Sequence, residues 1–174
     1  MYDFPMMARF NRWTNAKLFG TVANLDESEY FRDQGAFFGS VHRTLNHLLV
    51  VDRLWTGRIE GIDRGIRSLD QVLYENLDTL WSARVQEDDR IIALVDAIPH
   101  ERLDSIVTYD RIIGTGREEM RVRNILMTLF NHQTHHRGQV HALLTRSGLE
   151  PPPLDVGFFL EEIGESGAPG TIRR

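Results

Sequence analysis

Four long stretches of this sequence repeat apolar residues with the period of an α-helix, and this pattern limits the possible folds more than any other feature. The stretches run from about residue 5 to 25, from 40 to 59, from 69 to 98 and from 123 to 147. In each stretch the apolar side chains recur every three or four residues, which gathers them on one face of a helix. Because such faces are buried against one another, the sequence predicts an all-α fold built as a four-helix bundle.

Side chains at the ends of these stretches support the helical assignment. Asp3 and Ser40 are placed to cap the first and second helices by accepting hydrogen bonds from free backbone N–H groups. Ser68, with Gln71 three residues later, forms a capping box that predicts the start of the third helix directly after the serine. Gly148 follows the fourth helix, where the left-handed conformation that ends many helices favours glycine.

The third stretch contains the one interruption among the four helical patterns. Three consecutive acidic residues at 87–89 break its apolar face, and they predict a kink or a break at that point. Pro99 then ends the helix, because proline lacks the backbone N–H that a continuing helix requires.

The remaining segments are shorter and have other patterns. Residues 26–39 are acidic and interrupted by glycine, so they are predicted to form a loop. Residues 105–123 resemble a short β-hairpin with a glycine turn, which would form the crossover between the third and fourth helices. An apolar patch at 156–160 predicts a short helix docked on the bundle. We expect a single domain over residues 1–163 and a frayed tail over residues 164–174.

Composition excludes several classes of protein. The 174 residues include no cysteine, so disulfides, thiolate metal sites and cysteine nucleophiles are excluded. The formal net charge is 20 − 25 = −5 with no basic run, which argues against nucleic-acid binding. The longest strongly apolar run, residues 48–51, is far too short for a membrane span, and the start lacks the apolar region of a signal peptide. We therefore expect a cytoplasmic protein without nucleic-acid or membrane partners.

Histidines are concentrated in the fourth helical stretch, where four of the seven lie between residues 132 and 141. His132 and His136 are four residues apart, so on a helix they project from one face and could reach one divalent metal ion. A functional site needs a third ligand, and His47, in the middle of the second helical stretch, is the best candidate. Spacing alone fits a metal site and a pair of packed or surface histidines equally well.

Three neighbouring side chains could support such a site, and each has a plainer alternative. Gln139 lies one turn beyond His136, where it could hydrogen-bond a ligating imidazole or simply pack. His135 could line the mouth of the site, or it could be an ordinary solvated side chain. Asp52 shares a face with leucines, so it could anchor a ligating imidazole or form a structural salt link with an arginine. For Asp52 the salt link is the favoured interpretation.

Several motifs together resemble the DinB/YfiT family of metal-dependent proteins, and they span nearly the whole chain. They are Phe10-Asn-Arg-Trp-Thr-Asn15, Thr44-Leu-Asn-His-Leu48, Asp52-Arg-Leu-Trp55, Asn131-His-Gln-Thr-His-His-Arg-Gly-Gln139 and Gly148-Leu-Glu-Pro-Pro-Pro-Leu-Asp155. The resemblance implies a four-helix bundle in up-down-down-up order, often as a homodimer. It also implies a metal site of three histidines, which would fall on His47, His132 and His136.

Two functional interpretations follow, and the sequence leaves both open. The first is a metal-dependent enzyme that acts on a small-molecule substrate by thiol-dependent transfer or by hydrolysis. Nitrogen-only ligation suits zinc, nickel or iron(II), and the resemblance adds a low-molecular-weight thiol as a possible cofactor. No catalytic residue is assigned beyond the metal ligands. The second is a non-catalytic, metal-stabilised helical bundle that serves as a stress-related interaction or sensing protein.

Overall fold

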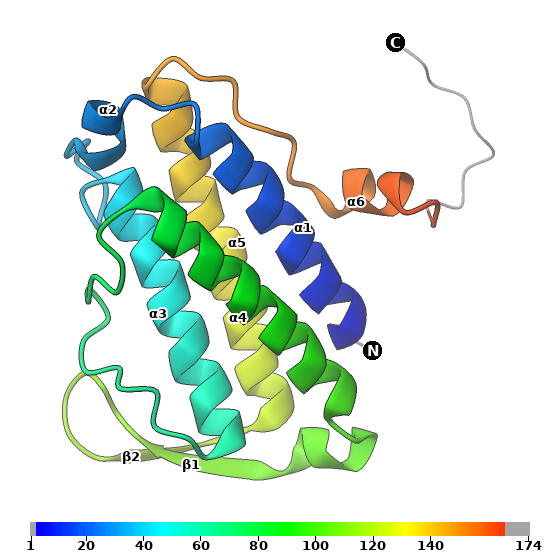
Figure 1. Cartoon of the computed structure of the whole chain (residues 1–174). Coiled ribbons are helices and arrows are strands. Elements are labelled where there is room, and N and C mark those ends of the chain that lie inside the picture. Colours follow the sequence, from blue (N-terminus) through cyan, green and yellow to red (C-terminus); the bar gives the residue numbers. More distant parts are fainter. Residues whose placement is uncertain (1–2, 166–174) are drawn as a thin grey trace.

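The structure is a computed structural model that describes residues 3–165 and is mostly helical (Figure 1). Its long helices are α1 (Phe4–Val22), α3 (Val41–Glu60), α4 (Leu77–Ala97) and α5 (Val122–Arg146). Its shorter elements are α2 (Glu27–Phe31), the 3-10 helix η1 (His100–Asp104), strands β1 (Ile106–Asp110) and β2 (Arg117–Arg121), and α6 (Val156–Glu162). None of the described helices is both long enough and apolar enough to cross a membrane.

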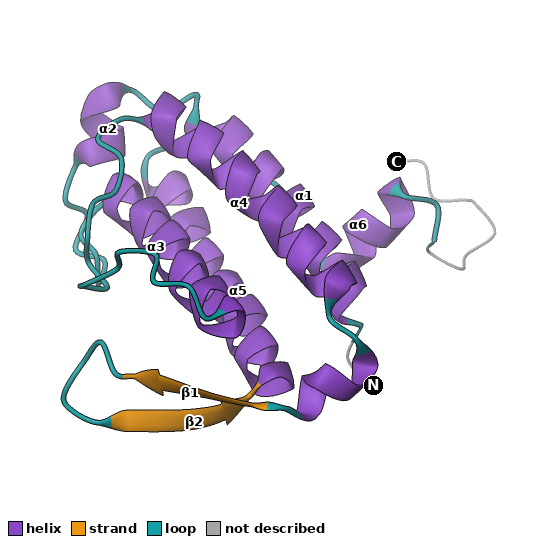
Figure 2. Cartoon of the chain, turned by 60° about the horizontal axis from the view of Figure 1, so that its bottom comes forward, coloured by secondary structure: helices purple, strands orange, loops and turns teal. Residues whose placement is uncertain are grey.

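The long helices pack in neighbouring pairs, with α1 and α3 each contacting both α4 and α5. In Figure 1, α1 and α5 run upward whereas α3 and α4 run downward. The chain therefore has to cross from the lower end of α4 to the lower end of α5. It does so through η1 and the antiparallel hairpin of β1 and β2, which lies below the helices in Figure 2 and contacts α3 and α5. This confirms the predicted hairpin between the third and fourth long helices.

Most of the predicted helix ends are confirmed. The side chain of Asp3 accepts a hydrogen bond from the Met6 backbone N–H at 2.9 Å, and that of Ser40 accepts one from Arg43 at 3.2 Å. Gly148 follows α5 with a φ of 80°, the left-handed conformation expected there. The predicted loop at 26–39 differs slightly, because it contains the five-residue helix α2.

The predicted start of the third helix is wrong, because α4 begins at Leu77 and not after Ser68. Asn76 is its cap, and the residues before it run along α3 in an irregular conformation. The Asn46 side chain explains this difference. Its Oδ1 accepts hydrogen bonds from the backbone N–H groups of Leu73 and Tyr74 at 2.9 and 3.0 Å, which replace the bonds of a helix.

The predicted kink at 87–89 is also wrong, since α4 is continuous from Leu77 to Ala97. Glu87 and Asp88 point inward and are only 6% and 1% exposed. They are held there by hydrogen bonds from Asn11 of α1 and Thr56 of α3 and by the ion pair of Asp88 with Arg84, one turn earlier on α4, so the acidic residues do not interrupt the packing.

The short helix predicted at 156–160 is confirmed as α6. Its Phe159 packs against Phe10 and Trp13 of α1, with ring centroids 5.7 and 5.8 Å apart. The predicted frayed tail at 164–174 lies almost entirely outside the described residues.

A layer of buried polar side chains separates two apolar clusters inside the molecule. One cluster lies toward the C-terminal end of α1 and the start of α3, and the other lies toward the start of α1 and the end of α3. Between them all four long helices contribute polar residues that are at most 3% exposed. We call this set the polar layer: Asn11, Asn15, Asp52, Arg84, Asp88, Gln133 and Arg137.

Arg84 lies at the centre of the polar layer. Its guanidinium is 2.7 Å from Asp52 and 3.0 Å from Asp88. Asn11 and Asn15 donate to the Asp88 carboxylate at 3.1 and 3.0 Å, which ties α1 to α4. Arg84 thus pairs with both acids of the layer, whereas Arg137 donates to the neutral amide oxygens of Asn11, Asn15 and Gln133.

We expect Arg84→Met to destabilise the protein by about 3–5 kcal/mol, because it leaves Asp52 and Asp88 buried without their cation. The matched control is Arg12→Met, which breaks the exposed pair with Asp89 and costs about 0–1 kcal/mol. Urea unfolding of the wild type and both variants measures the two free energies. Equal losses of unfolding free energy in the two variants would show that the buried ion pairs stabilise the protein no more than the exposed one.

Candidate metal centre

Helices α3 and α5 bring His47, His132 and His136 together. One ring nitrogen of each histidine lies within 4.8 Å of the corresponding atoms of the other two. The Nε2 atoms of His47 and His132 are 2.9 Å apart. His47 and His136 are buried and His132 is half-buried. We call this set the histidine triad.

Hydrogen bonds orient two of the three imidazoles. The Nδ1 of His47 donates to the backbone carbonyl of Leu69 at 2.7 Å, which leaves its Nε2 as an acceptor. The Nδ1 of His136 donates to the Gln139 Oε1 at 2.8 Å, which likewise frees its Nε2. Gln139 in turn donates from its Nε2 to the Nε2 of His135 at 3.1 Å. Metal-ligating histidines are usually held in this way.

The triad fits a divalent metal ion on the chemistry of its donor atoms. Two nitrogens bound to one ion at about 2.0–2.1 Å lie roughly 2.9–3.4 Å apart, and the separation between His47 and His132 falls in this range. The Nδ1 of His132 is buried and has no hydrogen-bond partner among the described residues. The Nε2 of His132 lies at hydrogen-bond distance from that of His47, so the triad leaves one imidazole nitrogen, the Nδ1 of His132, unsatisfied.

Burial keeps the triad in the neutral form that a metal ion binds. It lowers the pKa of His132 to about 3, with further lowering from the neighbouring histidines. It lowers the pKa of His136 to about 4, against the opposing effect of the Gln139 hydrogen bond. The pKa of His47 is also lowered by burial, while its bond to the Leu69 carbonyl opposes the shift. Each imidazole is thus ready to ligate without first losing a proton.

An aromatic side chain covers one side of the triad. Phe38, from the segment between α2 and α3, stacks on the His47 ring with centroids 3.9 Å apart and an interplanar angle of 24°. It also contacts His136 at 5.5 Å. Next to it Phe37 is 86% exposed, so the covering segment meets solvent directly.

The other candidate residues from the sequence have different positions. Gln139 contacts the triad through His136, and the exposed His135 contacts Gln139. Asp52 does not bond an imidazole, because it pairs with Arg84 in the salt link that the sequence favoured.

Sequence reasoning missed three groups around the site. The Leu69 carbonyl gives no signal, since any residue carries one and the segment was expected to be helical. Phe38 lies before the start of α3, outside any stretch of helical periodicity. Gln133 links α5 to the Asp52 carboxylate and accepts from Arg137 at 3.2 Å. Its position four residues after the buried Leu129 could have identified it as an inward-facing polar residue.

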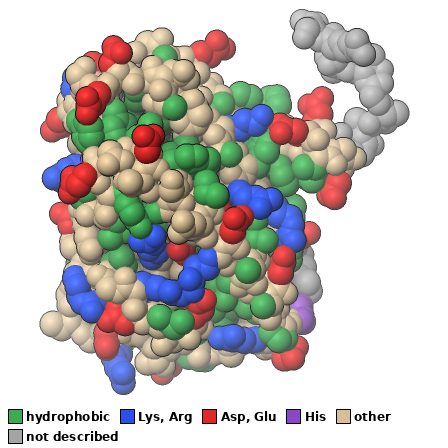
Figure 3. Space-filling view, in the orientation of Figure 1, with side chains coloured by type: hydrophobic (Ala, Val, Ile, Leu, Met, Phe, Trp, Pro, Cys, Tyr) green, Lys and Arg blue, Asp and Glu red, His purple; other side chains and the backbone are tan. Residues whose placement is uncertain are grey.

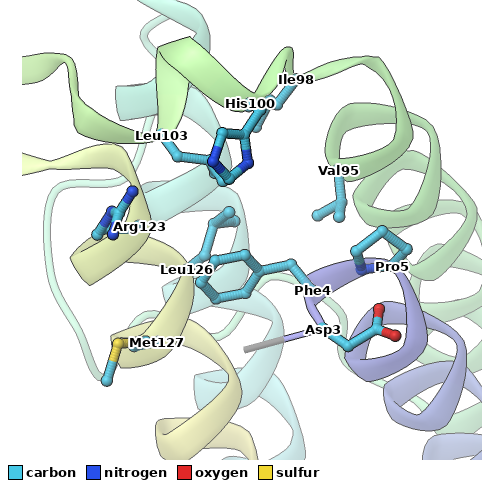
Figure 4. A pocket seen from close by; sticks show the side chains of 10 residues that line it. All are labelled: Asp3, Phe4, Pro5, Val95, Ile98, His100, Leu103, Arg123, Leu126 and Met127. Carbon is cyan, nitrogen blue, oxygen red and sulfur yellow. The ribbon is translucent and has the colours of Figure 1, made fainter. Parts of the chain in front are cut away.

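A separate cavity of about 560 Å³ lies at the other end of the helices, and it does not include the triad (Figure 4). Phe4, Val95, Leu103 and Leu126 are among its mostly apolar lining residues, and His100 also lines it.

The fold and the site define a mostly helical protein in which two long helices present three converging histidines. The sequence profile of the DinB family matches residues 1–167, and the chain belongs to this family. It is 22% identical over 164 residues to Protein DinB of Bacillus subtilis (strain 168), covering 92% of this chain and 95% of that protein. The crystal structure of a DinB-like protein from Bacillus cereus ATCC 10987 has the same fold. It has a TM-score of 0.64 at 16% identity, over 83% of this chain and 91% of that one.

The low pKa values predict that the metal-free protein loses stability as the pH falls from 7 to 5. Between these values an unfolded histidine, with a pKa of about 6.5, takes up a proton, whereas His132 and His136 in the folded protein do not. The expected loss is at most about 2 kcal/mol for each of these histidines. Urea unfolding of chelator-treated protein at both pH values measures it.

The matched variants for this pH experiment are His132→Gln, which reduces the loss, and His100→Gln, which removes an exposed histidine and leaves the loss unchanged. A wild-type protein equally stable at pH 7 and pH 5 would contradict the buried, neutral state of the triad.

We expect Gln139→Leu to weaken metal binding about 10- to 100-fold, because His136 loses the acceptor that fixes its orientation. Gln139→Glu keeps an acceptor oxygen and should retain or improve the affinity. Competition with a colorimetric chelator measures the metal affinity of both variants. Equal affinities of the leucine variant and the wild type would show that this bond does not position the ligand.

Proposed function

We propose that this protein is a metal-dependent enzyme of the DinB type, with one divalent ion held by His47, His132 and His136 and a small molecule as substrate. The observation that supports it is the convergence of three neutral imidazoles within 4.8 Å. Two of them are fixed through hydrogen bonds of their Nδ1 atoms, so Nε2 is the nitrogen that carries the lone pair for a metal ion.

The site offers three protein ligands, which favours catalysis over a purely structural role. No carboxylate joins the group of potential ligands among the described residues, and Asp52 is committed to Arg84 and Gln133. An ion with three protein ligands keeps a position for an exchangeable ligand, which closed structural sites lack. When bound, the metal would supply Lewis-acid chemistry toward a water molecule or a thiol.

Thiol-dependent transfer and hydrolysis are the two reaction classes that we propose for this site. Nitrogen ligation suits zinc, nickel or iron(II), and a low-molecular-weight thiol is the cofactor that the family resemblance suggests. The role of the chain's own residues is positional. The Leu69 carbonyl and Gln139 hold two imidazoles, and Phe38 shields one side of the triad from water.

A second candidate function is that of a non-catalytic helical bundle. In this case the bound metal stabilises the fold, or the protein senses whether the metal is available. The stacking of Phe38 on His47 favours it, because this ring restricts access to the triad from one side. The two candidate functions differ in whether the metal keeps a coordination position that a small molecule can occupy. A catalytic site admits a thiol or water to the metal, whereas a structural site does not.

For the fold, we propose the four-helix bundle in up-down-down-up order. The pairwise packing of the long helices and their directions in Figure 1 support it. A homodimer stays a prediction from the family resemblance, which light scattering can test.

We expect purified, untagged protein to contain about one zinc, nickel or iron ion per chain by plasma mass spectrometry. His47→Ala and His132→Ala should each lose it, because two imidazoles hold an ion far more weakly than three. The control is His141→Ala, which removes a histidine from the same helix outside the triad. A wild-type chain that neither contains nor takes up a metal would overturn the metal proposal.

The same preparations separate the two candidate functions. Cobalt-loaded protein should change its visible spectrum when a small thiol such as 2-mercaptoethanol is added, if the metal keeps an exchangeable position. An unchanged spectrum, together with a large loss of thermal stability on metal removal, would favour the structural role.

A further inference from the structure

Five arginines surround two adjoining depressions on the face that α3, α4 and the segment between them present. The smaller depression, about 280 Å³, is lined by Arg53, Arg64, Arg90, Gln86 and Glu87. The larger, about 410 Å³, shares Arg53 and Arg64 and adds Arg58 and Arg67 together with Asp63 and Asp110, of which Asp63 pairs with Arg67 at 2.7 Å. Figure 3 shows Lys and Arg side chains gathered over the lower part of this face. We call the two depressions together the arginine groove.

The carboxylates beside the smaller depression do not neutralise its cations. Arg64 and Arg90 share one carboxylate, that of Glu60, at 2.6 and 2.9 Å. Arg53 is 3.6 Å from Glu87, which also accepts a hydrogen bond from Thr56 at 3.0 Å. Three guanidinium groups thus face two carboxylates in a protein whose net charge is −5, so this positive excess is local.

Two of these guanidinium groups also have unused hydrogen-bond donors. The Nε atoms of Arg64 and Arg90 are buried and lack a partner among the described residues. Because these two atoms meet no solvent, an anion in the groove would contact the outer N–H groups of the two guanidinium groups.

The close approach that places Arg64 in the groove depends on a glycine in α3. A Cβ at Gly57 would lie 2.6 Å from the Ile62 carbonyl oxygen and 2.8 Å from the Arg64 Cγ. Without a side chain there, the segment after α3 folds back against the helix and lays the arginine stem across it. The groove is therefore built into the backbone path rather than formed by freely moving surface side chains.

We propose that the arginine groove binds the phosphate group of a small phosphorylated molecule. Arginine suits this role because its planar fork of N–H donors matches the oxygens of a phosphate. Both depressions are of small-molecule size, and no histidine of the triad lines either of them. The proposal is therefore independent of metal binding at His47, His132 and His136.

The probe is inorganic phosphate, titrated into the full chain at constant ionic strength and followed by calorimetry. Arg64→Gln and Arg90→Gln should each weaken binding about tenfold, the effect of losing one strong charged contact. Glu60→Gln should instead tighten it, because the two arginines lose their competing carboxylate. A general loss of folding cannot produce this opposite effect.

Three controls complete the experiment. Arg12→Gln removes one positive charge elsewhere and should leave binding unchanged, and acetate should bind more weakly than phosphate. His132→Ala should also leave binding unchanged, which separates the groove from a metal-bound anion. The proposal is overturned if the wild type does not bind phosphate, if Glu60→Gln fails to tighten binding, if acetate binds equally well, or if His132→Ala abolishes binding.

Discussion

The pairing of Arg84 with Asp52 and Asp88 is the interaction on which the arrangement of the helices depends. A buried charge that loses its partner costs several kcal/mol, so the long helices can pack only in a register that completes the polar layer. On α3 and α5 this register is set where Gln133 donates to Asp52. The two helices run in opposite directions, so moving back along α3 from Asp52 to His47 corresponds to moving forward along α5 toward His136. The histidine triad thus forms where the polar layer fixes the two helices.

Burial beside the polar layer determines the protonation state of the histidine triad. An imidazole on a solvated surface is partly protonated near neutral pH, and a protonated imidazole cannot bind a metal ion. Beside the polar layer, burial lowers the pKa of His132 and His136 well below neutrality. The cation at Arg137, one residue after His136, is hydrogen-bonded within the polar layer to the amide oxygens of Asn11 and Asn15. The protein therefore places neutral imidazoles directly beside buried charged side chains.

Much of this architecture could be predicted from the sequence, and the errors share one cause. The long helices and the alignment of His132 with His136 follow from helical periodicity, which depends on nearby residues alone. The acids at 87–89 predict a break because an acidic residue in an apolar stripe usually faces water. Asn11 and Thr56, which bond Asp88 and Glu87, lie on other helices where no local pattern reveals them, and the pairing of Asp88 with Arg84 one turn earlier does not by itself indicate burial. Likewise, Leu73 and Tyr74 fit a helix in sequence, but the Asn46 side chain 27 and 28 residues earlier satisfies their backbone instead.

The irregular segment between α3 and α4 positions groups that belong to the histidine triad and to the arginine groove. In a helix, the Leu69 carbonyl would be directed along the helix axis toward the N–H of residue 73. Because Asn46 takes that N–H, the carbonyl can accept from His47 and fix its orientation. Nearer α3, the turn permitted by Gly57 brings Arg64 onto the helix beside Arg53. One segment whose backbone bonds are satisfied by side chains thus supplies a ligand-orienting carbonyl at one end and a phosphate-binding cation at the other.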